Sequence, residues 1–326
     1  MLSLRDAAFA VRDTDGGSWS LRGAATRPLW PPLPVPPVST MEFCRRFSRA
    51  GIELHALADG SENVWTHINK STIITQVRTR LRDPGVINQW LTALCGPAAV
   101  VFELARRRPA RYVRMVRELL ETGEMSTVTG TTITADQDMR ERDPGPQPQI
   151  DWLLMATMRE QENFMADVEE GGPYESYTMW NAMQNWTRDV LGLGNNGWET
   201  CYSWGEIGVM AELRSALDQG GVAFMLIDAN LLHQWTGDDD ATIMVRKAEH
   251  TAAGALGDYH LWTQAKPPGF PPDHWVPVLD GLSVASSTEG EDQITVRVWS
   301  WAQEWELTGT ADALAGYLYA GVWGHE

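Results

Sequence analysis

Cysteine is scarce in this sequence, and no apolar run is long enough to cross a bilayer. The 326 residues include three cysteines, Cys44, Cys95 and Cys201, which cannot all pair and none of which forms a CxxC element. The sequence therefore argues against a disulfide framework and a zinc knuckle, and it predicts folding in a reducing compartment. Because the N-terminus has no basic segment followed by an apolar stretch, we expect no cleaved secretion signal and no membrane span.

Basic residues are also outnumbered. Lysine and arginine together number 26 against 43 acidic residues, which gives a formal net charge of −17. This balance disfavours nucleic acid or an anionic membrane as a partner. Arginines do cluster at 106–108 and 111–117, and we interpret that cluster as a solvated helix face. The hydrophobic content of 43% is typical of a globular protein, and the 16 tryptophans are expected in the core or in cleft walls.

Proline is concentrated near the N-terminus. Residues 1–40 end in PLWPPLPVPPV, which predicts an extended segment: a linker, an arm on the surface, or an inhibitory or docking strap over a functional cleft. Residues 41–326 are expected to form one domain. Within it, residues of about 123–200 read equally well as a cleft-shaping insertion or as ordinary core.

Several elements can be predicted from periodicity. An apolar helix begins near Cys95 and a second helix follows Pro109, with its apolar face at Tyr112, Val113, Val116, Leu119 and Leu120. The β-branched run 126–134 predicts a strand or hairpin, and 222–232 an apolar strand. The segments 274–279 and 293–299 predict an antiparallel hairpin, so residues 299–301 should lie near His274. We also expect Gly51 to end a short helix, Thr178 to cap another, and 192–198 to be a turn.

Cys95 has the surroundings that a nucleophilic thiol needs. It stands at the start of the apolar helix in the sequence Cys95-Gly96-Pro97, and Gln89 lies six residues upstream. The positive end of a helix favours the thiolate, and a side-chain amide can stabilise an oxyanion. His274, at the start of a predicted strand, is a suitable base. The alternative is a structural cysteine in a core helix.

This combination resembles the papain-fold cysteine peptidases. The Gln89 to Cys95 spacing matches the papain pattern, and the stretch 95–99, CGPAA, is similar to the bacterial branch that includes the double-glycine leader peptidases. The resemblance implies an α+β fold, in which the cysteine helix packs on an antiparallel sheet carrying the histidine, here with a helical insertion. It also implies a thiol protease without cofactor or metal.

A further resemblance is to papain-like cysteine protease effectors that bacteria deliver into competitors. It adds Asp151-Trp152, the stretch 159–163, REQEN, and His274-Trp275-Val276, and it covers 87–198 and 272–301. It implies a toxin held in the producer's cytoplasm and exported by a specialised secretion system. Its partners would be a protein substrate in the target cell and a cognate immunity protein.

The third catalytic position departs from the family. Papain has Asn-Ser-Trp-Gly after the histidine strand, whereas this sequence has Trp299-Ser300-Trp301-Ala302. Ser300 is therefore expected to orient His274, with Asp280 as an alternative if the strand register differs. Trp301 is expected to shield the pair from water, and Trp301 and Trp275 to contact substrate.

Two other functions fit the same residues. A papain-fold deamidase or transferase would use the same cysteine and histidine on a protein side chain. A pseudoenzyme that binds a protein through its tryptophan-rich cleft is favoured by the missing Asn or Asp. The presence of Gln89, Cys95 and His274 together argues against the pseudoenzyme.

Overall fold

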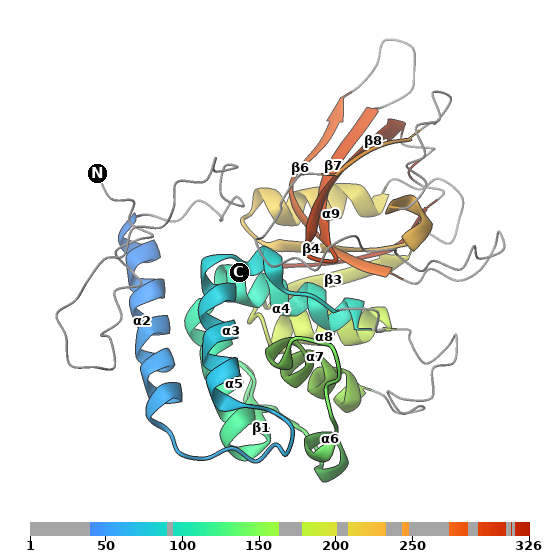
Figure 1. Cartoon of the computed structure of the whole chain (residues 1–326). Coiled ribbons are helices and arrows are strands. Elements are labelled where there is room, and N and C mark those ends of the chain that lie inside the picture. The colour runs from blue at the N-terminus through green and yellow to red at the C-terminus, as the bar shows by residue number, and fades with distance from the viewer. Residues whose placement is uncertain are drawn as a thin grey trace.

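The computed structural model describes residues 40–89, 94–162, 178–200, 208–232, 243–247, 274–285, 293–310, 314 and 317–326 (Figure 1). The predicted proline-rich segment 1–40 lies outside these residues except for Thr40. The helices are α2 (Thr40–Asp59), α3 (Lys70–Arg82), η1 (Pro84–Val86), α4 (Cys95–Arg107), α5 (Pro109–Thr122), α6 (Gln137–Glu141), α7 (Gln149–Glu162), α8 (Trp180–Asp189), α9 (Gly208–Asp218) and η2 (Ala229–Leu232). The strands are β1 (Glu124–Ser126), β2 (Thr132–Thr134), β3 (Asn195–Thr200), β4 (Val222–Ile227), β5 (Ile243–Lys247), β6 (His274–Ala285), β7 (Gln293–Ser300), β8 (Gln303–Thr310) and β9 (Leu318–His325).

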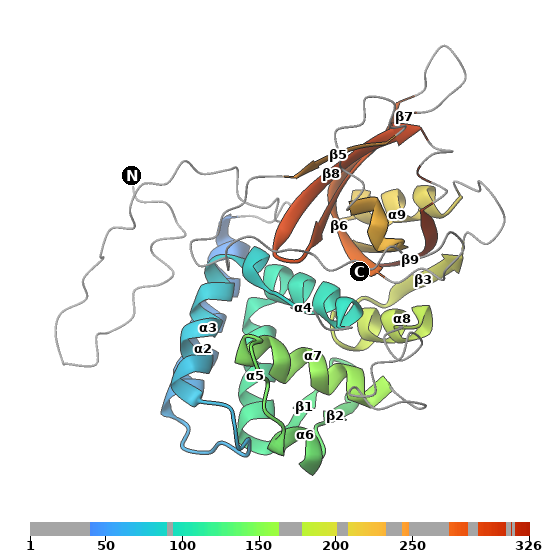
Figure 2. The ribbon, with the colours of Figure 1, turned by 45° about the vertical axis from the view of Figure 1, so that its right-hand side comes forward.

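A seven-stranded antiparallel sheet organises the described part of the chain. Its strand order is β3-β9-β4-β6-β7-β8-β5. Alternate residues of β4 face opposite sides, since side chains alternate along a strand. Phe224 packs into the core shared with α4, and Met225 packs into the core shared with α9. The helices α4 and α8 therefore lie on one side of the sheet and α9 on the other (Figure 2). The protein is of the α+β class, as predicted.

Most of the elements predicted from periodicity are present. The helix α5 begins at Pro109 and buries the five apolar residues predicted for its core face. Its C-terminus is capped by Gly123 at φ 76°, a left-handed conformation that glycine adopts without strain. The run 126–134 contributes to the hairpin of β1 and β2. The segments 274–285 and 293–300 pair as the predicted antiparallel hairpin.

Two glycine interpretations were wrong. Gly51 does not end a helix, because α2 continues from Thr40 to Asp59 through it. The roughly 1 kcal/mol cost of glycine in a helix is small beside the interactions of a 20-residue helix. The segment 192–198 is not a simple turn, because β3 begins at Asn195. Gly197 is needed for packing, since a Cβ there would lie 2.8 Å from Cζ2 of Trp323 on the neighbouring strand β9.

The arginine cluster at 106–108 is not a solvated face. Arg106 and Glu103 are buried, and the guanidinium donates to the carboxylate at 2.7 and 2.8 Å. Arg107 also pairs with Glu103, and its Nη1 donates to the carbonyl of Gly220 at 2.7 Å. Burial alone would raise the pKa of Glu103, but the charges and hydrogen bonds of the two arginines together lower it. This cluster ties the end of α4 to the turn before β4.

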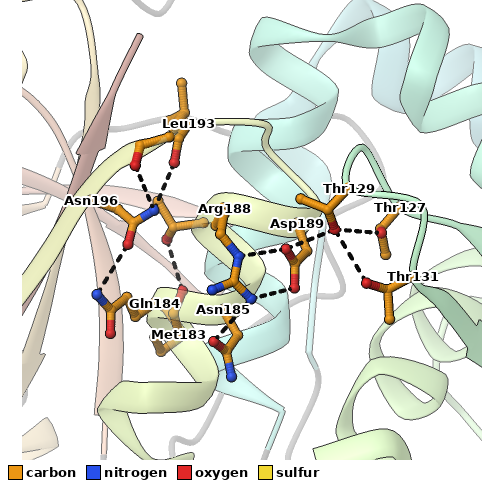
Figure 3. A network of polar contacts seen from close by, with 12 residues as sticks. Thr127, Thr129, Thr131, Met183, Gln184, Asn185, Arg188, Asp189, Leu193 and Asn196 are labelled. Carbon is orange, nitrogen blue, oxygen red and sulfur yellow. Dashed lines mark hydrogen bonds and ion pairs between the residues drawn. The ribbon is translucent and has the colours of Figure 1, made fainter.

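A polar network fixes α8 and β3 against the β1–β2 hairpin (Figure 3). Asp189 accepts hydrogen bonds from Thr129 at 2.9 Å and from Arg188 at 2.7 and 2.9 Å. Gln184 donates to the side-chain oxygen of Asn196 at 3.0 Å, which joins α8 to β3. The segment of about 123–200 thus contributes buried helices, since α7 packs on α4 and α8 on β9. In the described ranges no helix is long and apolar enough to cross a membrane.

Candidate active site

Cys95 is the first residue of α4, as the sequence predicted. The preceding residue, Leu94, caps the helix without a side-chain hydrogen bond, and Pro97 falls in the first turn, where a missing N–H costs nothing. Cys95 is buried, at 4% exposure. A thiolate at this end of the helix gains from the macrodipole and from backbone N–H groups that have no partner within the helix. The start of α4 therefore offers a negative charge at Cys95 a favourable electrostatic position.

His274 and Ser300 form a buried hydrogen-bonded pair. His274 is the first residue of β6 and Ser300 is the last residue of β7, and their antiparallel pairing brings these two ends together. The distance from Nε2 of His274 to Oγ of Ser300 is 2.5 Å, and both residues are 3% exposed. Ser300 therefore holds the imidazole through Nε2. Ser300 thus makes the contact with the histidine that the sequence predicted for it.

Trp301 covers the imidazole of His274. The two rings stack with centroids 4.2 Å apart and planes 10° apart. Trp301 and Ala302 form the two-residue turn between β7 and β8, with φ values of 48° and 57°. Positive φ costs a residue with a Cβ about 1–2 kcal/mol, so asparagine and glycine are the usual residues of such turns. A strained turn therefore holds the indole against the histidine, as the predicted shielding requires.

Thr178 connects the cysteine helix to the histidine strand. Its carbonyl accepts a hydrogen bond from the indole N–H of Trp275 at 2.7 Å, and its hydroxyl accepts one from Arg159 at 3.1 Å. On its other side it packs against Gly96, where a Cβ would lie 2.6 Å from Cγ2 of Thr178. The residues that follow Cys95 and His274 thus share one neighbour. In addition, α4 packs against β6 along the core.

The segment before Gln89 is held from two sides. Oδ2 of Asp151 accepts the backbone N–H of Asn88 at 3.0 Å, and the carbonyl of Gly85 accepts the indole N–H of Trp299 at 3.1 Å. Trp299 precedes Ser300, and its ring stacks on Phe102 of α4 at 4.5 Å. These contacts join the Gln89 segment, α4 and the end of β7. Gln89 itself is buried, at 7% exposure.

Three sequence predictions need correction here. Trp275 is 2% exposed, lies in the core on the α4 side of the sheet, and uses its N–H on Thr178, so it supports the site and is not placed to contact substrate. Asp280 pairs in register with Arg297, six residues along β6 from His274 and therefore about 20 Å away at the usual strand rise. Thr178 does not cap α8, whose N-cap is Met179. Of the stretch 159–163, Asn163 lies outside the described residues.

Thr178 is also the residue that sequence reasoning missed, because its role depends on Gly96 and Trp275, which lie far from it in the chain. The described ranges contain no group of three or more His, Cys, Asp or Glu residues that could hold a metal ion. No protein-family model matches this chain, and no curated protein matches it.

Proposed function

We propose that this protein is a papain-like cysteine peptidase in which Cys95 is the nucleophile and His274 the base. The observation that carries the proposal is the buried hydrogen bond between Nε2 of His274 and Oγ of Ser300. A catalytic histidine needs one nitrogen held by an orienting group so that the other can exchange protons. Cys95 at the start of α4, the helix packed on the histidine strand, supplies the matching nucleophile.

The reaction proceeds in two halves. Nδ1 of His274 takes the thiol proton, and the thiolate of Cys95 adds to the peptide carbonyl carbon. The side-chain amide of Gln89 and the backbone N–H of Cys95 stabilise the oxyanion. His274 then gives its proton to the leaving nitrogen, the C–N bond breaks, and a thioester remains. Water, deprotonated by His274, adds to the thioester, the C–S bond breaks, and the thiol is restored.

Burial of the site supports this chemistry. Cys95, His274, Ser300 and Gln89 are all buried, and Trp301 covers one face of the imidazole. Interactions between charged groups are stronger where water is excluded. Ser300 offers a hydroxyl in place of an amide or a carboxylate, so it holds the imidazolium less strongly than the residue usual in the family.

The proposal extends to the biological setting through the effector resemblance. The substrate class is then a protein of a target cell, and the partner is an immunity protein that covers Cys95. The high acidic charge of −17 is consistent with a protein partner in place of a nucleic acid.

The test is the fate of a protein substrate. An unfolded substrate such as casein is incubated with the wild type and with Cys95→Ala, and intact masses are recorded. Fragments made by the wild type alone support a peptidase. A gain of about one dalton without fragments identifies a deamidase that uses the same nucleophile. Unchanged masses together with stable, Cys95-independent binding of the substrate would contradict the proposal and favour a binding module.

A further inference from the structure

We propose that Asp151, held by Arg80, is a positioning residue that sets the oxyanion donor Gln89. This inference rests on the proposed function, because it assigns Gln89 the role of stabilising an oxyanion. Asp151 is fully buried and belongs to α7, whereas Arg80 belongs to α3. The two side chains meet in a bidentate pair, with Nε to Oδ1 at 2.7 Å and Nη2 to Oδ2 at 2.6 Å.

The carboxylate has a third bond that leads to the site. Oδ2 of Asp151 accepts the backbone N–H of Asn88, the residue immediately before Gln89. An isolated buried ion pair is a poor way to stabilise a protein, because desolvation offsets much of the attraction. A buried pair that also fixes a functional backbone segment has a second effect, since catalytic donors must be held within about 0.5 Å of the productive position.

The neighbouring contacts make this anchor rigid. Gln76 of α3 accepts the backbone N–H of Ile150 at 2.9 Å, so the first turn of α7 is tied to the helix that carries Arg80. The hydroxyl of Tyr112 is buried without a hydrogen-bond partner, and burial raises its pKa, with a further contribution from the charge of Asp151 and against the opposing charge of Arg80. The phenol stays neutral at physiological pH, so it leaves the charge balance of the pair unchanged.

The role can be isolated by comparing two reactions of Cys95. Iodoacetamide alkylates the thiolate by displacing iodide and forms no oxyanion. In contrast, p-nitrophenyl acetate acetylates the thiolate through a tetrahedral oxyanion, releases p-nitrophenolate and leaves a thioester that water cleaves to acetate. The ratio of the acetylation rate to the alkylation rate therefore reports the oxyanion donor alone.

The experiment is a double-mutant cycle with Gln89→Ala and Asp151→Asn. We expect Gln89→Ala to lower the ratio by about a hundredfold and Asp151→Asn to lower it by about tenfold. In the Gln89→Ala background, Asp151→Asn should lower the ratio no further. Glu103→Gln is the matched control, because it also removes a buried carboxylate paired with arginine. Its partner Arg107 contacts Gly220 and not the segment before Gln89. It should leave the ratio unchanged.

A second pair of variants keeps the test sound if Asp151→Asn does not fold. Asn88→Pro removes the N–H that Asp151 accepts and keeps the ion pair, and Ile87 at ψ 132° has the extended backbone that precedes proline. Asn88→Ala, which keeps the N–H, is its control. A tenfold loss for Asn88→Pro alone supports the inference. Equal losses with and without Gln89, or an equal loss in Glu103→Gln, would overturn it. If the wild type is not acetylated at Cys95, the proposed function fails with it.

Discussion

The indole of Trp301 lies parallel to the imidazole of His274, with the ring centroids 4.2 Å apart. This contact joins a turn with two positive φ values to the first residue of β6. It covers one face of the imidazole that is hydrogen-bonded to Ser300. A buried hydrogen bond is stronger when water cannot compete for it. Trp301 and Ser300 therefore both fix the position of the His274 imidazole, the first by stacking and the second by a hydrogen bond.

Replacing Trp301 tests that contact. Trp301→Ala should slow the alkylation of Cys95 near neutral pH by roughly fivefold, the rate equivalent of an aromatic pair worth about 1 kcal/mol. Trp301→Phe keeps a ring over the imidazole and should retain most of the rate. Rates measured by peptide mass spectrometry would reveal the difference, and equal rates in the two variants would show that the stack is irrelevant to the thiol.

Ser300 should matter less than His274. His274→Ala removes the base and should lower hydrolysis by about 10²–10⁴-fold. Ser300→Ala removes one neutral hydrogen bond worth about 1 kcal/mol, and should lower it by roughly fivefold. Ser300→Asn places a side-chain amide beside the imidazole and should retain more activity than Ser300→Ala, because the amide can still hydrogen-bond Nε2. Equal losses of p-nitrophenyl acetate hydrolysis rate in Ser300→Ala and His274→Ala would contradict this prediction.

Gly96 should tolerate no side chain. A methyl group there would approach Thr178 to 2.6 Å, so Gly96→Ala must displace the residue that links α4 to β6. Overpacking of this kind costs about 1–3 kcal/mol, and we expect a lower urea midpoint with slower alkylation of Cys95.

Gly51→Ala is the matched control for that variant. It also lies inside a helix, but a Cβ there has open space around it. It should stabilise the protein by about 0.5–1 kcal/mol through helix propensity alone. A stabilising Gly96→Ala would contradict the packing role of Thr178.

Glu103 gives the stability of the protein a defined pH dependence. Its pKa in the folded state is lowered by Arg106 and Arg107 against the opposing effect of burial, so its contribution is complete above the unfolded pKa near 4 and is lost as the pH falls through the lower folded value. Glu103→Gln should lower the free energy of unfolding by about 3 kcal/mol at about pH 7. The difference in this free energy between variant and wild type should become smaller below about pH 4. Denaturant titrations at several pH values measure this difference. A difference that stays constant or grows on acidification would contradict an ionised Glu103 paired with arginine in the folded state.

The sequence predicted the elements that depend on local pattern. The apolar run of β4, the periodic face of α5 and the start of α4 at Cys95 follow from side-chain spacing. The approach of residues 299–301 to His274 followed from hairpin geometry, because the two ends of an antiparallel pair must meet.

The contacts between distant segments could not be predicted in this way. Arg80 and Asp151 are 71 residues apart, and nothing in their local sequence marks them as partners. Thr178 resembles an N-cap by residue type, yet its hydroxyl and carbonyl serve Arg159 and Trp275. Gly197 resembles a turn residue in the sequence, but a glycine is needed there because the indole of Trp323 on β9 leaves no room for a side chain. Such roles appear only when the fold brings the segments together.

The pH dependence of Cys95 alkylation by iodoacetamide, in the wild type and in His274→Ala, tests the central claim most directly. An activated pair predicts rapid labelling of Cys95 well below pH 8, where an ordinary thiol is mostly protonated, and loss of that labelling without His274. Labelling that follows an ordinary thiol, or that is the same in both proteins, would contradict a catalytic role for Cys95 and His274.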